Sequence, residues 1–573
     1  MNMKPSLFAG VAVGLLVAMG AGVAAHAEPA ARSRHQRTRV VADPTLVAKV
    51  DALSAEVAAL ERRLDAEEAA RGRLESRARS AQADAARARA DAQAAQARLV
   101  EQIQTLPGEV DAAVAAKAPR TPAVSVTLGG FSAFETIYRS RNDVADIGSN
   151  YSKIPYLDQA TAHEDETRFS ARQSRLSLLV QGDIDPTTHA AFYGEFDFLG
   201  AGQTANSNES NSYQPRIRQV YGTVDWDDLG LHVLAGQTWS LATMNGHGIT
   251  PRAEDIPPTI EAQYVPGFVW ARQPQLRVAW DYHRQLWVAV SAENPQTTFA
   301  GAETGAALLA PGVSANVANA GVSLLNNQVA YSDNRYPDVI GKVAFEPMLW
   351  GGQPLHLEVF GIWRDYYDRV AYAVGNSLGA PAGAADRQAS GGGVGGGFTF
   401  TVVPHRIDVQ GSFLTGKGVG RYGSGQLPDA VEAADGAPVP IGETMFLVGG
   451  TLHATPALDL YAYYGQERES RAALEKLGPA LFGYGNPNAV LGSGCFAEGA
   501  SCSPDTQQID QITAGLWQRV YSGRFGFVRV GVQYSHTSLT AFSGFATASL
   551  AARVTPATSD DMVFTSFRYF PNF

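Results

Sequence analysis

The chain has 573 residues, of which 9% are aromatic, 18% are charged and only 2 are cysteine, so neither a disulfide-dense scaffold nor a four-cysteine metal site fits. The net charge of −11 has the wrong sign for a protein that binds phosphate backbones, and we expect no nucleic-acid partner. A mean hydropathy of −0.12, with no long apolar run after residue 30, excludes a bundle of membrane-spanning helices but not a membrane barrel with alternating strands.

Residues 1–27 have the organisation of a secretory signal peptide. Lys4 supplies the positive start, residues 7–25 are apolar, and Ala25-His26-Ala27 forms a small-x-small cleavage site. We therefore predict cleavage near Ala27 and export from the cytoplasm. An uncleaved N-terminal anchor is the alternative.

Residues 45–105 are predicted to form one long helix with a seven-residue apolar repeat. The first row of the repeat is Val50, Val57, Leu64, Ala78, Ala85, Ala92 and Leu99, and the second is Leu53, Leu60, Leu74, Ala81, Ala88 and Ala95. A lone helix would leave this stripe in water, so the pattern predicts self-association as a periplasmic coiled coil. A single charged helix that only spaces two regions is the alternative. Residues 106–123, which begin with Leu-Pro-Gly, form a linker.

From residue 124 to residue 573 the periodicity changes from seven to two. Leu276, Val278, Trp280 and Tyr282 fall on one face of a strand, and Gln275, Arg277 and Asp281 fall on the other. The same alternation recurs in residues 190–198, 355–364 and 524–536, between turns rich in Gly, Asn, Asp and Pro. About 450 residues of this kind predict an all-β transmembrane barrel of about 16 antiparallel strands, with 18 as the alternative count.

A soluble β-sandwich also alternates, with its apolar face turned inward. Export and aromatic residues near strand ends favour a barrel whose apolar face contacts outer-membrane lipid. The C-terminal strand, which finishes in Phe573, resembles the last strand of bacterial outer-membrane barrels. The sheet must then close, and its interior is polar. In the exported chain we also predict a disulfide between Cys495 and Cys502, with two free thiols as the alternative.

Several short motifs follow one another in a characteristic order. They are Arg172-Gln173-Ser174-Arg175-Leu176, Arg218-Gln219-Val220-Tyr221-Gly222, Ala235-Gly236-Gln237-Thr238-Trp239, Pro257-Pro258-Thr259-Ile260-Glu261, Arg272-Gln273-Pro274-Gln275-Leu276-Arg277, Glu293-Asn294-Pro295 and Gly416-Lys417-Gly418 with Arg421-Tyr422. Over most of the mature chain this set resembles the DcaP-like trimeric outer-membrane porins. The resemblance implies a homotrimer of sixteen-stranded barrels with periplasmic coiled coils, and uptake of small anions such as dicarboxylates. The glycine run 391–397 and the cysteine loop depart from that pattern.

Basic side chains that share a face with polar neighbours are expected to line the lumen. They are Arg175, Arg277, Lys342, Arg364, Arg529 and Arg568. We interpret them as a ladder that guides carboxylates inward through forked hydrogen bonds. Acidic residues with the same orientation compete with this interpretation, because they could neutralise the ladder: Glu195, Asp197, Asp281, Glu358, Asp408 and Asp459.

Three other arginines have the alternation of lipid-facing residues, namely Arg172, Arg216 and Arg218, and we place them at a membrane interface. The orientation of Arg272 stays open, because Pro274 can mark a bulge.

The long connection 240–267 is the predicted constriction loop, since long loops of porins fold inward and long loops in general carry function. Its candidate residues are Arg252, Glu254, Asp255, Glu261 and Tyr264. A loop lying on the rim is the alternative. The acidic run 163–166 could bind Ca²⁺, but a solvated loop explains it more simply, and we predict no metal and no cofactor.

The sequence therefore favours a water-filled channel for small hydrophilic solutes, with small anions as partners. A structural tether, in which the barrel anchors a coiled coil that reaches the cell wall, is the alternative. We expect no enzyme activity, because no Gly-x-Ser-x-Gly elbow, His-Glu-x-x-His helix or Walker loop occurs. A hydrolase built across barrel strands is the remaining rival.

Overall fold

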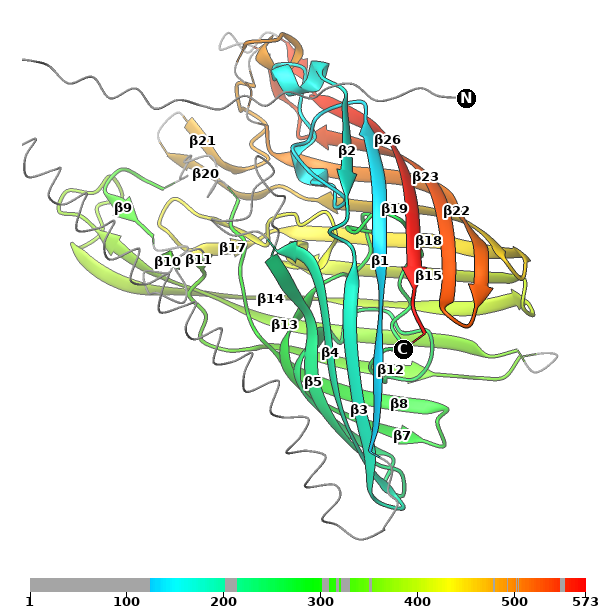
Figure 1. Cartoon of the computed structure of the whole chain (residues 1–573). Helices are drawn as coiled ribbons and strands as arrows, with labels where there is room; N and C mark the ends of the chain where they lie inside the picture. Colours follow the sequence, from blue (N-terminus) through cyan, green and yellow to red (C-terminus); the bar gives the residue numbers. More distant parts are fainter. Residues whose placement is uncertain are drawn as a thin grey trace, which may run out of the picture. The chain divides into compact units, whose positions relative to one another are not determined.

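The fold is described from a computed structural model of the chain (Figure 1). The structure describes residues 124–572, except 201–213, 301–308, 316–318, 321–329, 350–352, 478–479, 492, 501, 503 and 547–551. The predicted signal peptide, coiled coil and linker lie outside the described residues.

Antiparallel strands form one sheet of 18 members, and 16 of them close into a ring. The ring consists of β1 (Ser125–Arg139), β3 (Arg175–Asp185), β4 (Thr188–Gly200), β5 (Gln214–Trp226), β6 (Leu231–Trp239), β7 (Arg272–Tyr282), β8 (Leu286–Glu293), β12 (Asp338–Phe345), β13 (Leu355–Tyr372), β14 (Gly383–Val403), β15 (Ile407–Lys417), β18 (Gly442–Thr455), β19 (Leu458–Glu469), β22 (Thr506–Gly523), β23 (Gly526–Ala541) and β26 (Ala557–Phe570). β1 pairs with β3 on one side and with β26 on the other, which closes the ring (Figure 1). The predicted barrel of about 16 strands is confirmed.

Two further strands extend this sheet without entering the ring. β2 (Glu166–Ser170) continues β3 along β1 after a break, and β9 (Val313–Ser314) pairs with the end of β13. Four pairs of short antiparallel strands lie in the described connections: β10 (Asn319–Ala320) with β11 (Ala330–Tyr331), β16 (Ala430–Glu432) with β17 (Pro438–Pro440), β20 (Ala472–Leu477) with β21 (Ala480–Tyr484), and β24 (Gly544–Phe545) with β25 (Arg553–Val554). The helical turns η1 (Tyr151–Lys153), η2 (Ala160–His163), η4 (Gly420–Tyr422) and η5 (Ser493–Phe496) lie in the same connections.

The two ends of the ring differ in the length of their connections. One end, the turn end, has short connections such as 186–187, 283–285, 404–406 and 524–525. The other end, the loop end, has the long connections 140–165, 240–271, 294–337, 418–441 and 470–505. Transmembrane barrels have this asymmetry, with short turns on one side and long loops on the other.

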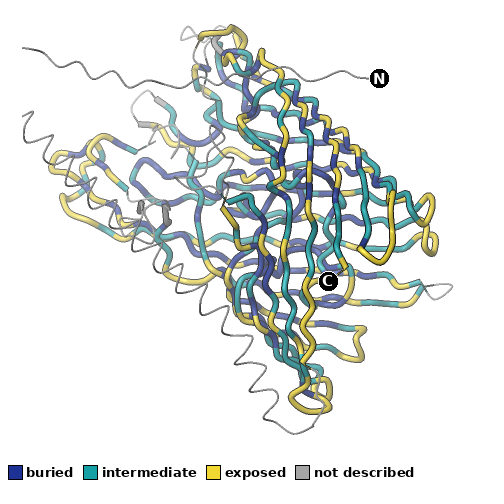
Figure 2. Tube along the Cα trace, in the orientation of Figure 1, coloured by how far each residue is buried: buried dark blue, intermediate teal, exposed yellow. Residues whose placement is uncertain are grey.

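The outer face of the ring is apolar and the inner face is polar. Leu276 and Tyr282 of β7 are 55% and 56% exposed, whereas Gln275 and Arg277 between and beside them are 7% and 4% exposed. Figure 2 shows the same alternation of exposed and buried residues along most strands. A sandwich would bury its apolar face, so the outward orientation of the apolar side chains is confirmed. Within the described part of the chain, no helix is both long enough and apolar enough to cross a membrane.

The interior of the ring is packed by three of the long connections. Residues 140–165, 240–271 and 418–441 contribute Tyr151, Ile260, Phe268 and Leu427 to a buried cluster that also includes Trp517 of the wall. The glycine run 391–397 of β14 allows such packing, because atoms of other residues already occupy the positions that side chains at alternate glycines would take. A Cβ on Gly395 would lie 2.3 Å from the Phe360 ring, and one on Gly397 would lie 2.8 Å from Sδ of Met244.

Candidate functional site in the barrel lumen

The segment 240–271, between β6 and β7, lies inside the ring and is attached to strands on several sides of it. Its hydrogen bonds join Asn245 N to Glu358 of β13 (3.1 Å), Asp255 to Thr399 of β14 (2.6 Å), Gly267 N to Glu467 of β19 (2.7 Å), Pro258 O to Trp517 of β22 (2.8 Å) and Ile260 N to Gln533 of β23 (2.6 Å). These strands are spread around the barrel, so the segment crosses the lumen.

The candidate residues of this segment face different parts of the wall. The Arg252 guanidinium donates a hydrogen bond to the Tyr221 hydroxyl (3.1 Å) and lies 5.5 Å from the centre of the Tyr193 ring. The Tyr264 hydroxyl accepts a hydrogen bond from Arg218 (3.3 Å). Arg252 and Tyr264 both have φ of +67°, which is uncommon for residues other than glycine and marks two sharp changes of chain direction.

The acidic residues of the segment are buried, and burial disfavours their charged form. Burial raises the pKa of Glu254 and of Asp255, and raises the pKa of Glu261 to about 7. Glu261 Oε1 accepts a hydrogen bond from Ser149 N (3.1 Å), which ties the segment to the connection 140–165. Glu261 and Asp255 therefore fix the segment in place.

Three of the predicted lumen cations point inward but are covered. Lys342 forms an ion pair with Glu358 (2.7 Å), and Arg364 forms ion pairs with Asp338 (3.1 Å) and Asp429 (2.6 Å). Arg277 donates to the carbonyl oxygen of Trp239 (2.7 Å). These three side chains are at most 4% exposed as residues, and their partners lie on the internal connections or next to them. They anchor those connections to the wall, and a passing solute cannot reach Lys342 or Arg364 in this arrangement.

The other three predicted cations form one cluster with aromatic rings. Arg175 lies over Phe131 (5.2 Å), Arg568 lies over Phe131 (5.0 Å) and Trp517 (4.7 Å), and Arg529 lies over Trp517 (4.1 Å) and Phe570 (4.9 Å). We call these six residues the arginine–aromatic cluster. The sequence pattern does not identify the three aromatic rings of this cluster, because aromatic residues near strand ends suit the lipid interface equally well.

The cluster has more positive than negative charge. Arg529 of β23 is the direct register partner of Arg568 on β26 and of Arg519 on β22. Arg568 has one carboxylate partner, Glu135 (3.0 Å). Among the described residues, no carboxylate oxygen lies within 4 Å of Arg529. Like charges on directly opposed residues are destabilising, so this row has an energetic cost that a structural role does not explain.

The placement of Arg216 and Arg218 at a membrane interface is wrong. Arg218 is 2% exposed and forms ion pairs with Glu195 (2.6 Å) and Asp197 (3.1 Å) inside the ring, and Arg216 pairs with Asp197 (2.7 Å). The register between β4 and β5 shifts by one residue at this point, so that a bulge resets the alternation. An arginine pair on a lipid face would be costly, and that cost was the available signal for the bulge.

Arg172 and Arg272 also belong to the interior side of the wall. Arg172 forms an ion pair with Asp146 (3.2 Å) of the connection 140–165, so its interface placement is wrong too. Arg272 lies over the rings of Trp239 (4.9 Å) and Trp270 (5.6 Å).

The inward acids divide into two groups. Glu195, Asp197 and Glu358 pair with Arg218, Arg216 and Lys342, as described above. The others bind histidines near the turn end: His232 lies between Asp225 (2.7 Å) and Asp281 (3.1 Å), and His453 lies between Asp408 (2.9 Å) and Asp459 (2.7 Å). The second group therefore does not contact the arginine–aromatic cluster, in which Arg568 pairs with Glu135 and Arg175 lies 3.7 Å from Glu195.

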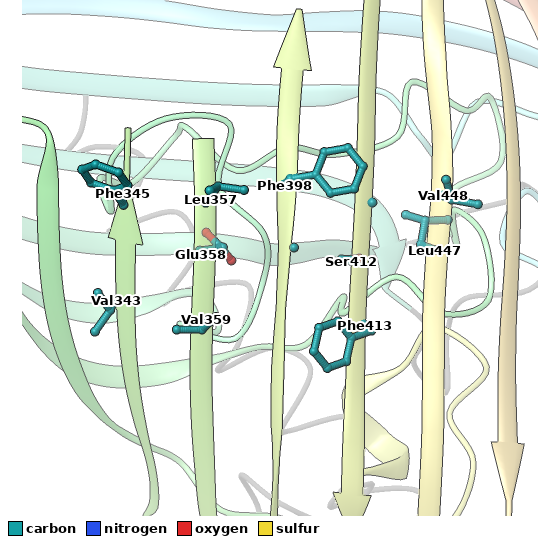
Figure 3. Close-up of a pocket in the computed structure, with 12 residues that line it drawn as sticks. Val343, Phe345, Leu357, Glu358, Val359, Phe398, Ser412, Phe413, Leu447 and Val448 are labelled. Carbon is teal, nitrogen blue, oxygen red and sulfur yellow. The ribbon is translucent and has the colours of Figure 1, made fainter. Parts of the chain in front are cut away.

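Two polar cavities lie on opposite sides of the segment 240–271. The cavity toward the turn end has a volume of about 910 Å³ and is lined by His189, His232, Arg252 and Arg284. The cavity toward the loop end has a volume of about 390 Å³ and is lined by Asp146, Arg172 and Arg216. A third, apolar groove of about 620 Å³ lies between Val343, Val359 and Phe413 on the outer face and is separate from the lumen (Figure 3).

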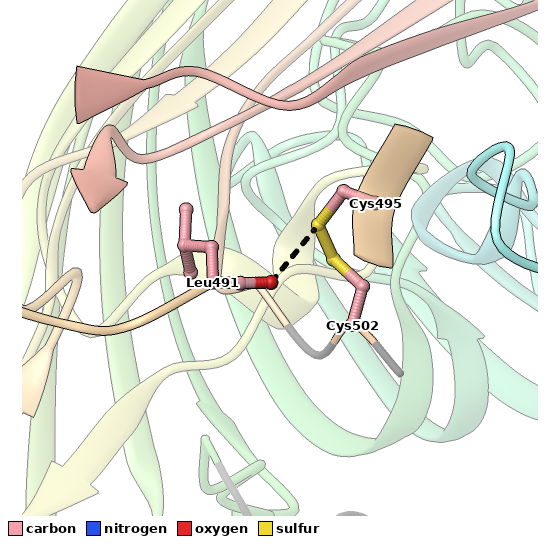
Figure 4. Close-up of a disulfide and its surroundings, with 3 residues drawn as sticks. All are labelled: Leu491, Cys495 and Cys502. Atoms are coloured by element: carbon pink, nitrogen blue, oxygen red, sulfur yellow. Dashed lines mark hydrogen bonds between the residues drawn. A yellow bond between two sulfur atoms is a disulfide. The ribbon is translucent and has the colours of Figure 1, made fainter. Parts of the chain in front are cut away.

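The two cysteines are joined by a disulfide within a loop-end connection (Figure 4). Sγ of Cys495 lies 3.7 Å from the carbonyl oxygen of Leu491, and Gly499 N donates to Asp158 O (2.9 Å) in the connection 140–165. In the part of the chain that the structure describes, no group of His, Cys, Asp and Glu side chains is arranged to hold a metal ion.

A closed sixteen-stranded barrel with an apolar outer face, a polar interior and an inward connection is the fold of a porin-type channel. No protein-family model matches the chain, and no curated protein matches its sequence. The structure is similar to the crystal structure of the outer membrane channel DcaP of Acinetobacter baumannii, with a TM-score of 0.52 and 18% identity over 78% of this chain and 97% of that chain. This similarity supports, at the level of the fold, the resemblance that the sequence motifs indicate.

Two further solved structures match with lower TM-scores. They are the anion-selective porin from Comamonas acidovorans (TM-score 0.41, 14% identity, 78% of this chain and 100% of that chain) and OmpF of Salmonella typhi (TM-score 0.40, 9% identity, 78% of this chain and 100% of that chain).

Proposed function

We propose that the protein is an outer-membrane porin that lets small hydrophilic anions, such as dicarboxylates, diffuse passively through its lumen. The observation that carries the proposal is the row Arg519, Arg529 and Arg568, in which two arginines lack a carboxylate partner among the described residues. Passive selectivity depends on the fixed charges at the narrow part of a pore. A row of guanidinium groups with an excess of positive charge raises the local concentration of anions.

The chemistry of the cluster favours carboxylates over other anions. Guanidinium groups bind a carboxylate through two parallel N–H···O bonds, and stacking on rings holds their planes in fixed directions. Arg529 and Arg568 both stack on Trp517 and come from adjacent strands. Arg519 and Arg529, which face each other on adjacent strands and have no carboxylate partner among the described residues, can each take one carboxylate group of a dicarboxylate, so the cluster and its neighbour support that substrate class.

The assembly and location complete the proposal. We propose export with cleavage near Ala27, a periplasmic coiled coil over residues 45–105 and a homotrimer in the outer membrane, on the grounds given by the sequence. A chain whose outer face exposes Leu276, Val290 and Phe413 needs a lipid environment, which supports the membrane location.

Reversal potentials in planar bilayers under a salt gradient test the anion preference. We expect the purified protein to prefer anions, and Arg529→Gln to reduce that preference strongly. Arg524→Gln is the matched control, since Arg524 lies in the turn between β22 and β23 and its loss changes the total charge equally. Cation preference in the unaltered protein, or equal effects of the two substitutions, would contradict the proposal.

Liposome swelling tests the substrate class independently of charge selectivity for salt ions. We expect four-carbon dicarboxylates to enter faster than neutral sugars of similar size, and Arg529→Gln to remove the difference. Equal rates for both solutes in the unaltered protein would indicate a general pore and contradict dicarboxylates as the substrate class.

A further inference from the structure

The outer face of β15, β18 and β19 has two unpartnered cations near the loop end. Lys417 ends β15, and Arg468 is the last residue but one of β19; both are exposed. Within the described residues, neither side chain makes a hydrogen bond or an ion pair. Lys417 shares its side of β15 with Phe413, and Arg468 shares its side of β19 with Tyr464, so both cations lie on the lipid-facing surface.

The cations border a groove with a polar floor. The groove has a volume of about 520 Å³ and is lined by Thr415, Thr444 and Ser470 between the two cations. The register places Thr444 of β18 between Thr415 of β15 and Arg468 of β19. Two strand spacings and an offset of two residues along the strands separate Lys417 from Arg468, about 12 Å, which two long side chains can span from either side of one group.

The groove lies just above an aromatic band. Phe413 and Phe446 occupy the next row toward the middle of the barrel and Tyr464 lies one row further, with the Phe446 and Tyr464 ring centres 5.7 Å apart. Aromatic rings at this position mark the boundary between hydrocarbon and headgroups. Lys417, Arg468 and the hydroxyl groups therefore stand at the depth of lipid phosphates.

The same face contains a contrasting arginine that is neutralised. Arg369, on the outer side of β13, forms an ion pair with Asp386 of β14, which also pairs with Arg335. Glu443 and Glu469 also line the groove but are buried toward the inner side of the wall. The oxygens of Asp510, beside the groove, accept hydrogen bonds from Tyr464 (3.0 Å), Gln466 (2.6 Å) and Gln508 (2.6 Å). Asp510 is therefore already engaged, and the two cations stay available to a ligand.

We infer that this groove binds the phosphate-bearing headgroup of a membrane lipid in the leaflet at the loop end. Lys417 and Arg468 hold the phosphate from two sides, the hydroxyl groups of Thr415 and Thr444 line its seat, and the aromatic band packs against the acyl chains below. The inference concerns the outer face and goes beyond the proposed transport function.

Native mass spectrometry of the detergent-solubilised full chain, with added diphosphoryl lipid A or its dephosphorylated form, tests the site. We expect the unaltered protein to bind the diphosphoryl form more tightly, and the double variant Lys417→Gln, Arg468→Gln to lose on the order of thirtyfold in affinity for it. Arg369→Gln is the matched control and should keep the preference. The heat-dependent gel mobility of folded barrels checks that all variants fold.

Three results would overturn the inference. One is equal binding of both lipid forms by the unaltered protein, which would mean that the cations only extend toward water. Another is a phosphate preference that survives in the folded double variant. The third is loss of lipid binding when excess inorganic phosphate is added, which would assign the groove to a free anion and not to a lipid.

Discussion

Arg529 of β23 lies directly opposite Arg568 of β26 inside the ring, and a single carboxylate, Glu135, is paired with the second arginine. Both guanidinium groups stack on Trp517, at 4.1 Å and 4.7 Å from its ring centres. The indole face partly compensates the repulsion between them, because an aromatic face attracts cations. The wall of the lumen is therefore built to keep two neighbouring positive charges with little neutralisation.

Replacing Glu135 by Gln is expected to strengthen anion selectivity. The substitution removes the negative charge beside Arg568 and keeps the shape of the side chain, so the net positive charge of the cluster rises by one. We expect the anion-to-cation permeability ratio from reversal potentials to rise by about twofold or more. Glu164→Gln, in an exposed loop, is the control and should change nothing. An unchanged ratio in Glu135→Gln would show that solutes do not pass this cluster.

Removing the buried cation Lys342 is expected to destabilise the barrel. Lys342→Met removes the lysine partner of Glu358 in a site that water does not reach and leaves His356 as the remaining ion-pair partner of that carboxylate among the described residues, which costs about 3–5 kcal/mol in the free energy of unfolding. Urea unfolding in detergent, followed by tryptophan fluorescence, measures the loss. The exposed Lys417→Met should lie within about 0.5 kcal/mol of the unaltered protein. Equal stabilities of both variants would show that the ion pair contributes nothing.

The glycine face of β14 is expected to tolerate no side chain. The Cβ of Gly395→Ala would lie 2.3 Å from the Phe360 ring and 2.6 Å from the Phe413 carbonyl oxygen, so strand and ring must move apart at a cost of about 1–3 kcal/mol. Gly341→Ala on β12 is the matched control, because its Cβ meets nothing within 4 Å. The same urea titration compares them, and a Gly395→Ala protein as stable as the Gly341→Ala protein would refute the packing account.

Glu261 is expected to make the barrel more stable at acidic pH. Burial raises its pKa to about 7 from an ordinary value near 4.5, so between these values the folded chain holds a proton that the unfolded chain has lost. The free energy of unfolding therefore falls as pH rises from about 4.5 to 7, by on the order of 3 kcal/mol, and this contribution stays constant at higher pH.

The comparison of Glu261→Gln with the unaltered protein isolates this contribution. We expect urea unfolding at pH 5 and pH 8 to show a smaller loss of stability in the variant, because glutamine has no proton to lose. Identical pH dependence in both proteins would show that Glu261 is not the group responsible.

Much of the barrel could be predicted from the alternation of residue types, since a strand with one face in lipid and one in water has few other solutions. The strand that contains Leu276, Trp280 and Arg277 shows this most clearly. The alternation fails where a bulge shifts the register, as it does beside Arg216 and Arg218. A bulge changes the side of every residue beyond it, and its position depends on contacts across strands that a linear pattern does not contain.

The accessibility of lumen residues could not be predicted at all. The alternation assigns Lys342 and Arg529 to the same face, yet only the structure shows that internal connections cover the first and leave the second stacked on rings. Whether a cation is neutralised depends on which loop reaches it. That is a property of three-dimensional packing between segments more than 100 residues apart in the chain, such as Asn245 and Glu358.

Because every strand of the described ring has two bonded neighbours, the ring has no open sheet edge to which a strand of a second copy could add. The described barrel can therefore contact a second copy through the side chains of its outer surface. Single substitutions on that surface can weaken the contact between two barrels while each barrel stays folded. Assembly and permeation can therefore be tested separately.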